Sequence, residues 1–238
     1  RNGLWFQFIN NRWIDMETNT ELFDKISKEM CEEYCRRLSQ CNIQGSSDNL
    51  TEEEREASQK KGEKILNVIK KLKTNNSKKS IMDECKTLFY HKNFINKLDT
   101  NPYLIGFENG IYDLQAGEFR EGRPEDYVSM STEIDYIEFD EDDENWPELK
   151  HFLETIFPDE EILKYVLTFF ASCLQGVNKE EKFRIWIGSG SNGKSKLEEL
   201  FNHAFGQYCM KFPITLLTGK RPASNACSPE VIRAKGKR

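Results

Sequence analysis

"WIGSGSNGKSK", from Trp186 to Lys196, decides how the C-terminal part of this chain is expected to fold. Within it, Gly188–Ser195 matches the pattern G-x-x-x-x-G-K-[ST]. The preceding run, Phe183–Ile187, is β-prone and has the length of a strand. The apolar residues that follow recur with the spacing of an amphipathic helix, at Leu197, Leu200, Phe201 and Ala204. A strand, a glycine loop and a helix are the context in which this pattern forms a phosphate-binding loop.

The residue types of the loop have a physical reason. Backbone N–H groups can wrap a β-phosphate only where side chains are small and some φ angles are positive. A helix starting near Gly193 adds its unpaired N–H groups and its dipole. We expect Lys194 to reach the β- and γ-oxygens as the catalytic residue, and Ser195 to give one oxygen to Mg²⁺. The expected site for ATP and Mg²⁺ consists of Gly188, Ser189, Gly190, Ser191, Asn192, Gly193, Lys194 and Ser195.

Hydrolysis would need a carboxylate at a neighbouring strand end. The next expected strand, Met210–Leu217, contains no acid, and a short helix starting at Ser228 leads into a basic turn. The chain starts at Arg1 and stops at Arg238, and we expect both ends to be cuts. The sequence therefore predicts weak ATP binding without hydrolysis by this chain alone.

The first hundred residues are expected to be mainly helical. The opening run from Gly3 to Met16, with turn residues at Asn10-Asn11, is typical of a short hairpin or a docking strand. Thr51 followed by Glu54 is a capping-box signature at the start of a helix. The polar stretch 44–64 is expected to be exposed and to form a loose linker. The helical stretches indicated by apolar spacing are Glu21–Leu38, Thr51–Leu72 and Ser77–Leu98.

From Asn101 the pattern changes to short β-prone runs separated by turn residues, and Asn109-Gly110 predicts a hairpin. Whether this β-meander is only a compact module or also holds a ligand stays open. Helix returns at Leu149, and apolar residues between 162 and 173 predict a broad buried stripe. The expected fold is an α+β module of helices and a β-meander at 1–140, followed at 141–238 by the start of an α/β P-loop ATPase domain of the AAA+ type.

The composition limits the class of protein. The 238 residues suit one large domain or two small ones, and 12% aromatic residues argue against a disordered chain. The net charge is −6, with twelve carboxylates against one Lys between Asp135 and Glu161, whereas the part after Glu181 is basic. The basic part could contact DNA or be a solvated surface. The candidate DNA contacts are Lys220, Arg221, Arg233, Lys235, Lys237 and Arg238.

The seven cysteines indicate reduced, intracellular thiols, because an odd count without a signal peptide does not suit a disulfide framework. Cys31, Cys35 and Cys41 have poor spacing for zinc on one helix, so buried or idle thiols are favoured. No apolar run has the length needed to cross a bilayer. We therefore expect an intracellular, cytosolic protein without a membrane partner.

The stretches 188–208 and 216–238 resemble superfamily 3 helicases of the primase–helicase type, which occur in poxviruses, giant viruses, related large DNA viruses, phages and plasmids. "FENGIYDL" (107–114) and "FREGRPEDYVS" (119–129) resemble the module that precedes the helicase in those proteins. The resemblance covers roughly residues 100–238. It implies a hexameric, ring-forming ATPase that translocates on DNA during replication, often fused to a primase, and in a viral case located at the replication site in the host cell.

By the same resemblance, residues 188–195 are the ATP site. Lys196 stands where a Thr is common, and the carboxylate pair, the sensor and the arginine finger have no matching positions. Two alternatives stay open. One is another P-loop class, such as a kinase or a GTPase, although no guanine-reading Asn-Lys-x-Asp and no Arg-rich lid occur. The other is an assembly module that docks a primase or neighbouring subunits.

Overall fold

The computed structural model describes the chain except residues 1–3, 17–18, 47–50, 178–181, 183 and 220–228. It divides into two compact units. Residues 1–6 and 15–92 form one, which we call the helical unit; residues 7–14 and 93–238 form the other, the sheet unit. The described part is α+β, with helices and two small antiparallel sheets. This confirms the coarse fold class.

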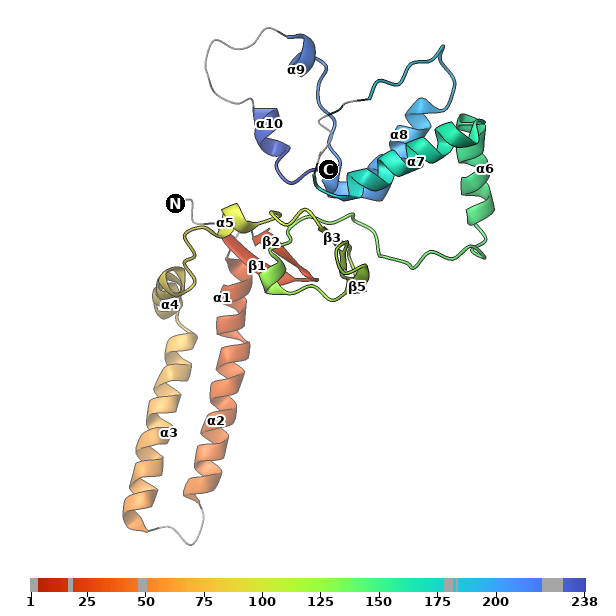
Figure 1. Ribbon diagram of the computed structural model, residues 1–238. Coiled ribbons are helices and arrows are strands. Elements are labelled where there is room, and N and C mark those ends of the chain that lie inside the picture. Colours follow the sequence, from red (N-terminus) through yellow and green to blue (C-terminus); the bar gives the residue numbers. More distant parts are fainter. Residues whose placement is uncertain (1–3, 17–18, 47–50, 178–181, 183, 220–228) are drawn as a thin grey trace. The chain divides into compact units, whose positions relative to one another are not determined.

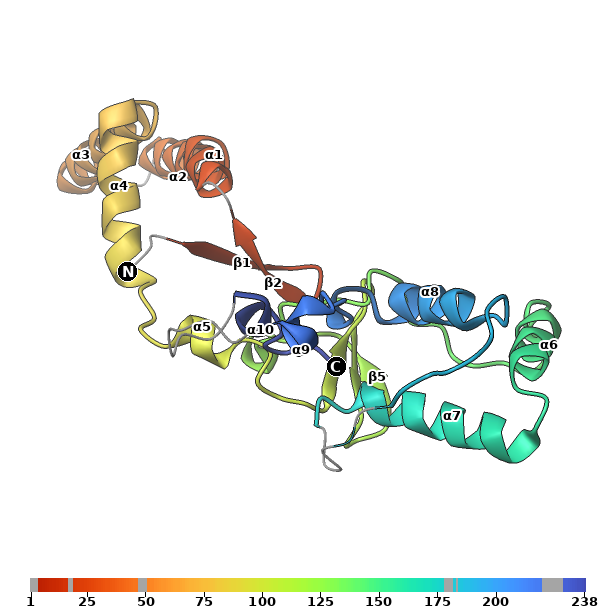
Figure 2. The same cartoon turned by 90° about the horizontal axis from the view of Figure 1, so that it is seen from above.

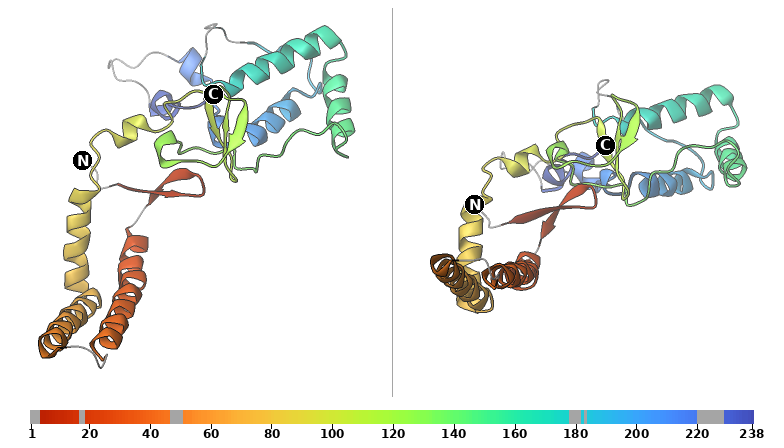
Figure 3. Two further views of the ribbon diagram at one scale, coloured as in Figure 1. Left: turned by 60° about the horizontal axis from the view of Figure 1, so that its bottom comes forward. Right: turned by 90° about the horizontal axis from the view of Figure 1, so that it is seen from below.

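In the helical unit, α2 and α3 run antiparallel, side by side (Figures 1 and 3). The expected helical stretch Glu21–Leu38 is helical, but in two pieces, because the chain breaks at Lys28, where φ is −104° and ψ is −74°. The expected linker 44–64 is wrong in part: Glu52 onwards is helical, and 47–50 lie outside the described residues. The helices of this unit are α1 (Thr20–Ser27), α2 (Glu29–Gly45), α3 (Glu52–Leu72) and α4 (Asn75–Leu88).

The capping box at the start of α3 is confirmed. Thr51 Oγ1 accepts from the Glu54 N–H at 3.4 Å, and Glu54 Oε2 accepts from the Thr51 N–H at 2.9 Å. These hydrogen bonds from the Thr51 backbone and side chain lower the pKa of Glu54. Two of the N–H groups that a helix start leaves unpaired are thereby satisfied, which explains why a polar sequence becomes helical here.

The core of the helical unit is small. Ile26, Leu72 and Met82 bring α1, α3 and α4 together, and Trp5 and Phe23 pack against them. The expected helix Ser77–Leu98 ends early, at Leu88, and a short helix α5 (Phe94–Lys97) follows in the sheet unit.

Both predicted hairpins are present. The turn between β1 (Trp5–Ile9) and β2 (Arg12–Met16) uses positive φ at Asn10 and Asn11, 49° and 64°, which suits a two-residue hairpin loop. The second sheet has the order β3-β4-β5, and the Phe107 N–H donates to the Gly110 carbonyl at 2.8 Å across the Asn109-Gly110 turn. Its strands are β3 (Leu104–Gly106), β4 (Ile111–Asp113) and β5 (Glu118–Arg120).

The C-terminal part of the sheet unit contains helices joined by coil, with no strand in the residues described. Helix α6 lies across one end of α7 and α8 (Figure 2). In the described part of the chain, no helix is both long and apolar enough to span a membrane. The helices are α6 (Trp146–Ile156), α7 (Glu160–Leu174), α8 (Lys194–Phe205), α9 (Thr215–Thr218) and α10 (Pro229–Arg233).

Three expectations for this part are wrong. Of the strand expected at 183–187, residue 183 lies outside the described residues and 184–187 are not a strand, while 210–217 contain coil and α9 instead of a strand. The predicted apolar stripe of α7 is not buried, since Ile162 remains 52% exposed. A strand needs a hydrogen-bonded neighbour, and no described segment pairs with 184–187. Apolar side chains such as Ile187, 89% exposed, therefore have nothing to pack against.

Candidate phosphate-binding site

The loop before α8 has the backbone that the glycine pattern requires. The φ angles of Gly190, Ser191 and Gly193 are 98°, 48° and 80°. A Cβ on Gly190 would meet nothing within 4 Å, so the conformation, and not crowding, calls for glycine there. The expectation that some dihedrals are positive is confirmed, and the expected amphipathic helix is present as α8.

The start of α8 offers backbone N–H groups to an anion. The hydrogen bond that closes the first turn of α8 runs from the Leu197 N–H to the Gly193 carbonyl, at 2.9 Å. The N-cap residue is Gly193, which has no side chain that could accept hydrogen bonds from these N–H groups. The N–H groups of the first turn are therefore left for a ligand or for water, and the helix dipole favours a negative group at this end.

Lys194 is turned back over the loop. Its Nζ donates to Asn192 Oδ1, and a Cβ built on Gly188 would lie 2.8 Å from that Nζ and 2.0 Å from Asn192 Nδ2. Only a glycine at 188 leaves room for these two polar heads. Ser195 is exposed in the first turn. Lys196 differs from Lys194, since it pairs with Glu199 at 2.8 Å on the side of α8.

Aromatic packing holds the flanks of the loop. The rings of Phe170 in α7 and Phe201 in α8 stack with centroids 3.4 Å apart, and Trp186 meets Phe170 edge-on at 5.7 Å. A Cβ on Gly193 would lie 2.6 Å from Ile156 of α6, so helix α6 closes against the loop end. Sequence reasoning missed Ile156, and no local signal could have revealed a contact 37 positions away.

The turn that follows α8, residues 206–208, is hydrogen-bonded to β3 and to the segment after the meander. Tyr208, 2% exposed, accepts from the Gly106 N–H at 2.8 Å and donates to the Met130 carbonyl at 3.1 Å. Burial raises the pKa of Tyr208 to about 12, so the hydroxyl keeps its proton. Gln207 and Ser131 exchange two further bonds, at 3.0 and 3.1 Å. Helix α8 is thus anchored to the β-meander formed by β3, β4 and β5. The sequence did not indicate this link.

Two of the six candidate DNA contacts face protein. The Arg238 guanidinium donates to the carbonyls of Pro102, Leu104 and Leu174, and Lys237 Nζ donates to the Gln207 carbonyl. Burial lowers the pKa of Arg238. A cavity of about 150 Å³ lies beside Arg238 and is not lined by the loop. Arg233 and Lys235 are exposed, while Lys220 and Arg221 lie outside the described residues.

The described chain brings together no group of three or more His, Cys, Asp or Glu that could hold a metal. Within α2, Cys31 and Cys41 are buried and Cys35 is exposed. The Cys41 thiol donates to the Ser58 carbonyl of α3 at 3.3 Å, which joins the two helices. The two buried thiols therefore fill small spaces in the packing of α2, as free cysteines commonly do.

Comparison with known proteins gives relatives from large DNA viruses. The chain is 42% identical, over 99% of its length, to "Putative helicase L207/L206" of Acanthamoeba polyphaga mimivirus, and covers 24% of that protein. It is 35% identical over 72% of its length to "Putative helicase 184R" of Invertebrate iridescent virus 6, covering 18% of it. It is 28% identical over 67% of its length to "Putative primase C962R" of African swine fever virus, covering 17% of it. The chain thus spans a quarter or less of the length of these relatives.

The family described as "D5 N terminal like" matches residues 1–158. The match includes the N-terminal helices, which the resemblance noted from the sequence, at 100–238, did not cover. It also includes both predicted hairpins and the first helix of the C-terminal part. The chain therefore belongs to the D5 N terminal like family, whose relatives here carry the names of viral helicases and primases.

Proposed function

We propose that this chain contains the ATP-binding portion of a DNA helicase of the superfamily 3 primase–helicase type. The observation that carries the proposal is the glycine loop with positive φ at Gly190 and Gly193, joined to the N-terminus of α8, with Lys194 Nζ held over it. The names of the viral relatives support a role in replication.

The residues present fit ATP with Mg²⁺. The open space at Gly190 and the free first turn of α8 suit the β-phosphate. Lys194 would exchange the Asn192 amide oxygen for phosphate oxygens, which are stronger acceptors because they are charged. Ser195, exposed in the same turn, would offer its hydroxyl to Mg²⁺. The bound Mg²⁺ would neutralise phosphate charge during phosphoryl transfer.

Other parts of the proposal concern the larger protein. We propose that residues 1–140 precede the ATPase domain and that 141–238 begin it. We also propose that ATP hydrolysis needs carboxylates from outside this chain, so that the chain alone binds ATP weakly and does not hydrolyse it. The larger protein would be a homohexamer on DNA, associated with a primase and located in the cytosol at a viral replication site.

The exposed apolar residues around the loop support the start of an α/β domain. Ile185 and Ile187 and the α7 face with Ile162 have the composition of a buried strand and of a helix that covers a sheet. Packing against the rest of such a domain would remove these side chains from water.

The test is the binding of a fluorescent ATP analogue with Mg²⁺ to the 238-residue chain. Replacing Lys194 with Ala should weaken binding at least tenfold, because the charged hydrogen bond to the phosphates is lost. Lys196→Ala is the matched control and should leave binding unchanged, since that lysine pairs with Glu199. Equal effects of the two variants would overturn the site assignment. Stronger competition by GTP than by ATP would overturn the choice of nucleotide.

A further inference from the structure

The helical unit has an internal charge division. Residues 15–59 contain twelve carboxylates and five basic side chains, whereas residues 60–92 contain ten Lys and three carboxylates. The boundary falls within α3, whose first turn is acidic and whose last turn is basic. This order favours the helix dipole, but the excess of lysine continues through α4 and beyond its end. Helix stability alone therefore does not account for it.

Most of these lysines are exposed and without an acidic partner. We call six of them the lysine surface. The side chains of five have no ion-pair or hydrogen-bond partner within the residues described, and the sixth, Lys86, pairs with Asp83 at 2.7 Å. Lys60 and Lys78 are left out because they contact Glu56 and Ser27. The lysine surface consists of Lys64, Lys70, Lys71, Lys73, Lys79 and Lys86.

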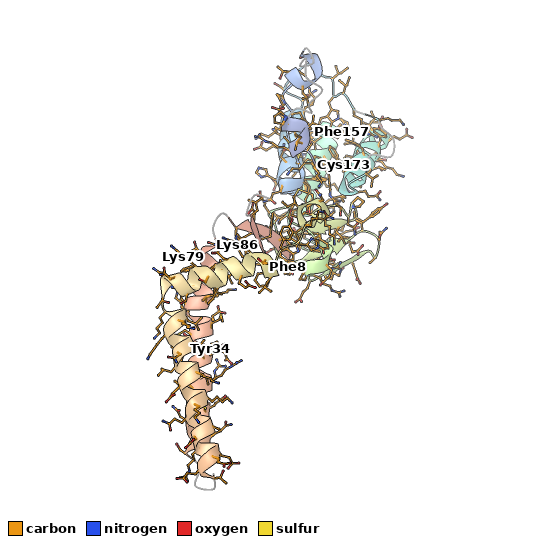
Figure 4. The ribbon with its side chains drawn as sticks, turned by 90° about the vertical axis from the view of Figure 1, so that its left-hand side faces the viewer. Phe8, Tyr34, Lys79, Lys86, Phe157 and Cys173 are labelled. Carbon is orange, nitrogen blue, oxygen red and sulfur yellow. The ribbon has the colours of Figure 1, made fainter. Side chains whose placement is uncertain are left out.

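The lysines form rows on two connected helices. Lys64 and Lys71 are seven residues apart, so they lie on one side of α3, about 10 Å from each other along the axis. The buried positions Gly62, Ile69 and Leu72 lie on another side. Lys79 and Lys86 have the same spacing on α4, which crosses the end of α3 (Figures 1 and 4). The positive charge therefore runs from the end of α3 along α4.

Two aromatic rings stand at the end of this row. Phe89 and Tyr90 follow directly on α4 and are 67% and 66% exposed. Neither ring contacts another aromatic ring in the described chain. Lys86 and Lys92 flank them in the sequence. Neighbouring exposed aromatic rings are uncommon on a solvated surface, and together with a row of cations they form the arrangement that holds unpaired bases and the phosphates between them.

We propose that the helical unit binds single-stranded nucleic acid, with phosphates on the lysine surface and bases stacked on Phe89 and Tyr90. The biological setting of this site rests on the proposed helicase function, but its physics does not involve the phosphate loop. Single strands fit better than a duplex, because only unpaired bases can stack on protein rings. The carbonyl end of α4 disfavours phosphate, which agrees with bases, and not phosphates, at Phe89 and Tyr90.

Fluorescence anisotropy of a labelled 20-nucleotide oligo-dT tests the charge component. Without nucleotide or Mg²⁺, the double variant Lys71→Glu/Lys79→Glu should bind at least tenfold more weakly than the unaltered chain. The matched control is the double variant Lys150→Glu/Lys164→Glu, which makes the same change in net charge. It replaces two exposed lysines, one in α6 and one in α7. It should bind within threefold of the unaltered chain. Equal losses in both double variants would overturn the location of the site.

The salt dependence separates phosphate contact from stacking. For single strands the slope of log K against log salt is about −0.7 per phosphate contact, so the Lys71/Lys79 variant should have a slope shallower by about 1.4. Phe89→Ala/Tyr90→Ala should weaken binding about tenfold or more with the slope unchanged. Unchanged affinity of this aromatic variant would overturn the stacking step.

The unaltered chain and the Lys194→Ala variant should bind oligo-dT equally well. Loss of ATP-analogue binding with oligo-dT binding retained would support the surface and the proposed nucleotide site separately. Absence of oligo-dT binding at low salt would overturn the surface and leave the nucleotide site standing. Binding to vesicles of anionic lipid with no binding to oligo-dT would also overturn it. Circular dichroism of each variant confirms that these exposed substitutions leave the helices intact.

Discussion

The β-meander and the phosphate-loop region belong to the same unit but differ in how they are packed. Around the meander, Ile111 and Ser131 are completely buried and Tyr208 nearly so, with polar partners for the buried hydroxyls. Around the loop, α7 has no buried residue in the described chain, and residues 185–187 are exposed. The meander therefore has a closed core, to which Tyr208 contributes, whereas the loop region is built on aromatic stacking between α7 and α8. This comparison predicts where substitutions will be costly.

The largest effect is expected at Tyr208. Tyr208→Ala should lower the local free energy of opening by about 4 kcal/mol, through the cavity left in a tight core. Tyr208→Phe should cost about 2 kcal/mol, because the Gly106 N–H and the Met130 carbonyl lose their buried partner. Hydrogen exchange of peptides covering β3 measures both. A loss below 1 kcal/mol in Tyr208→Ala would contradict the view of the meander as a closed core.

A second prediction compares one glycine from each region. Gly206→Ala should cost about 3 kcal/mol, because φ is 48° and the new Cβ would lie 2.2 Å from the Thr132 carbonyl oxygen. Gly190→Ala should cost only about 1 kcal/mol, because its φ is also positive but the space around it is open. Hydrogen exchange in peptides around each site gives the two values. Equal costs would mean that the two regions are packed alike.

A third prediction uses pH. Burial alone would raise the pKa of Asp126, but hydrogen bonds from Arg120, at 2.8 Å each, and from the Arg123 N–H hold it below its ordinary value. The resulting stability is present above the unfolded pKa, about 3.9, and is lost as the pH falls through the lower folded pKa. The turn containing Asp126 should therefore loosen only below about pH 4.

Trp13 can report this loosening, since its indole N–H donates to the Pro124 carbonyl at 2.8 Å. A chain with Trp5, Trp146 and Trp186 replaced by Phe leaves Trp13 as the only tryptophan, which can be excited selectively at wavelengths where tyrosine does not absorb. Its acid transition should shift or flatten in Asp126→Asn. In a second chain that keeps only Trp186, the same substitution should leave the loop region's transition unchanged. A shift of the Trp186 signal would show that the two regions respond to acid together.

The sequence was sufficient where a local signal sets the backbone. Asn10-Asn11 and Asn109-Gly110 form hairpins, Thr51 and Glu54 cap α3, and the glycine pattern precedes α8. It was insufficient where contacts are distant in the chain. The bonds of Tyr208 to Gly106 and of Arg238 to Pro102 join residues more than 100 positions apart. Such pairs have no spacing rule, and a strand such as 184–187 depends on neighbours that periodicity does not show.

A fourth prediction concerns a smaller contact of the meander. The Asn109 side chain accepts from the Tyr136 N–H at 2.8 Å and donates to the Tyr136 carbonyl at 3.0 Å, in the manner of a paired strand. Asn109→Ala should therefore cost about 1 kcal/mol. Asn109→Asp should recover only the acceptor bond and cost nearly as much. Exchange of the Tyr136 amide gives the direct measurement, and no change in its protection would contradict this role.

The smallest effect is expected on the exposed face of α7. Ile162→Ala should change stability by less than 0.5 kcal/mol, because about half of that side chain already contacts water. Leu153→Ala, in the neighbouring α6 and 7% exposed, should cost about 3 kcal/mol for a similar loss of atoms. Urea unfolding followed by Trp186 fluorescence compares the two. If Ile162→Ala were the costlier variant, the α7 face would have to be covered in solution. Repeating the unfolding at lower protein concentration would then test self-association, because the stability of a self-associated chain falls on dilution.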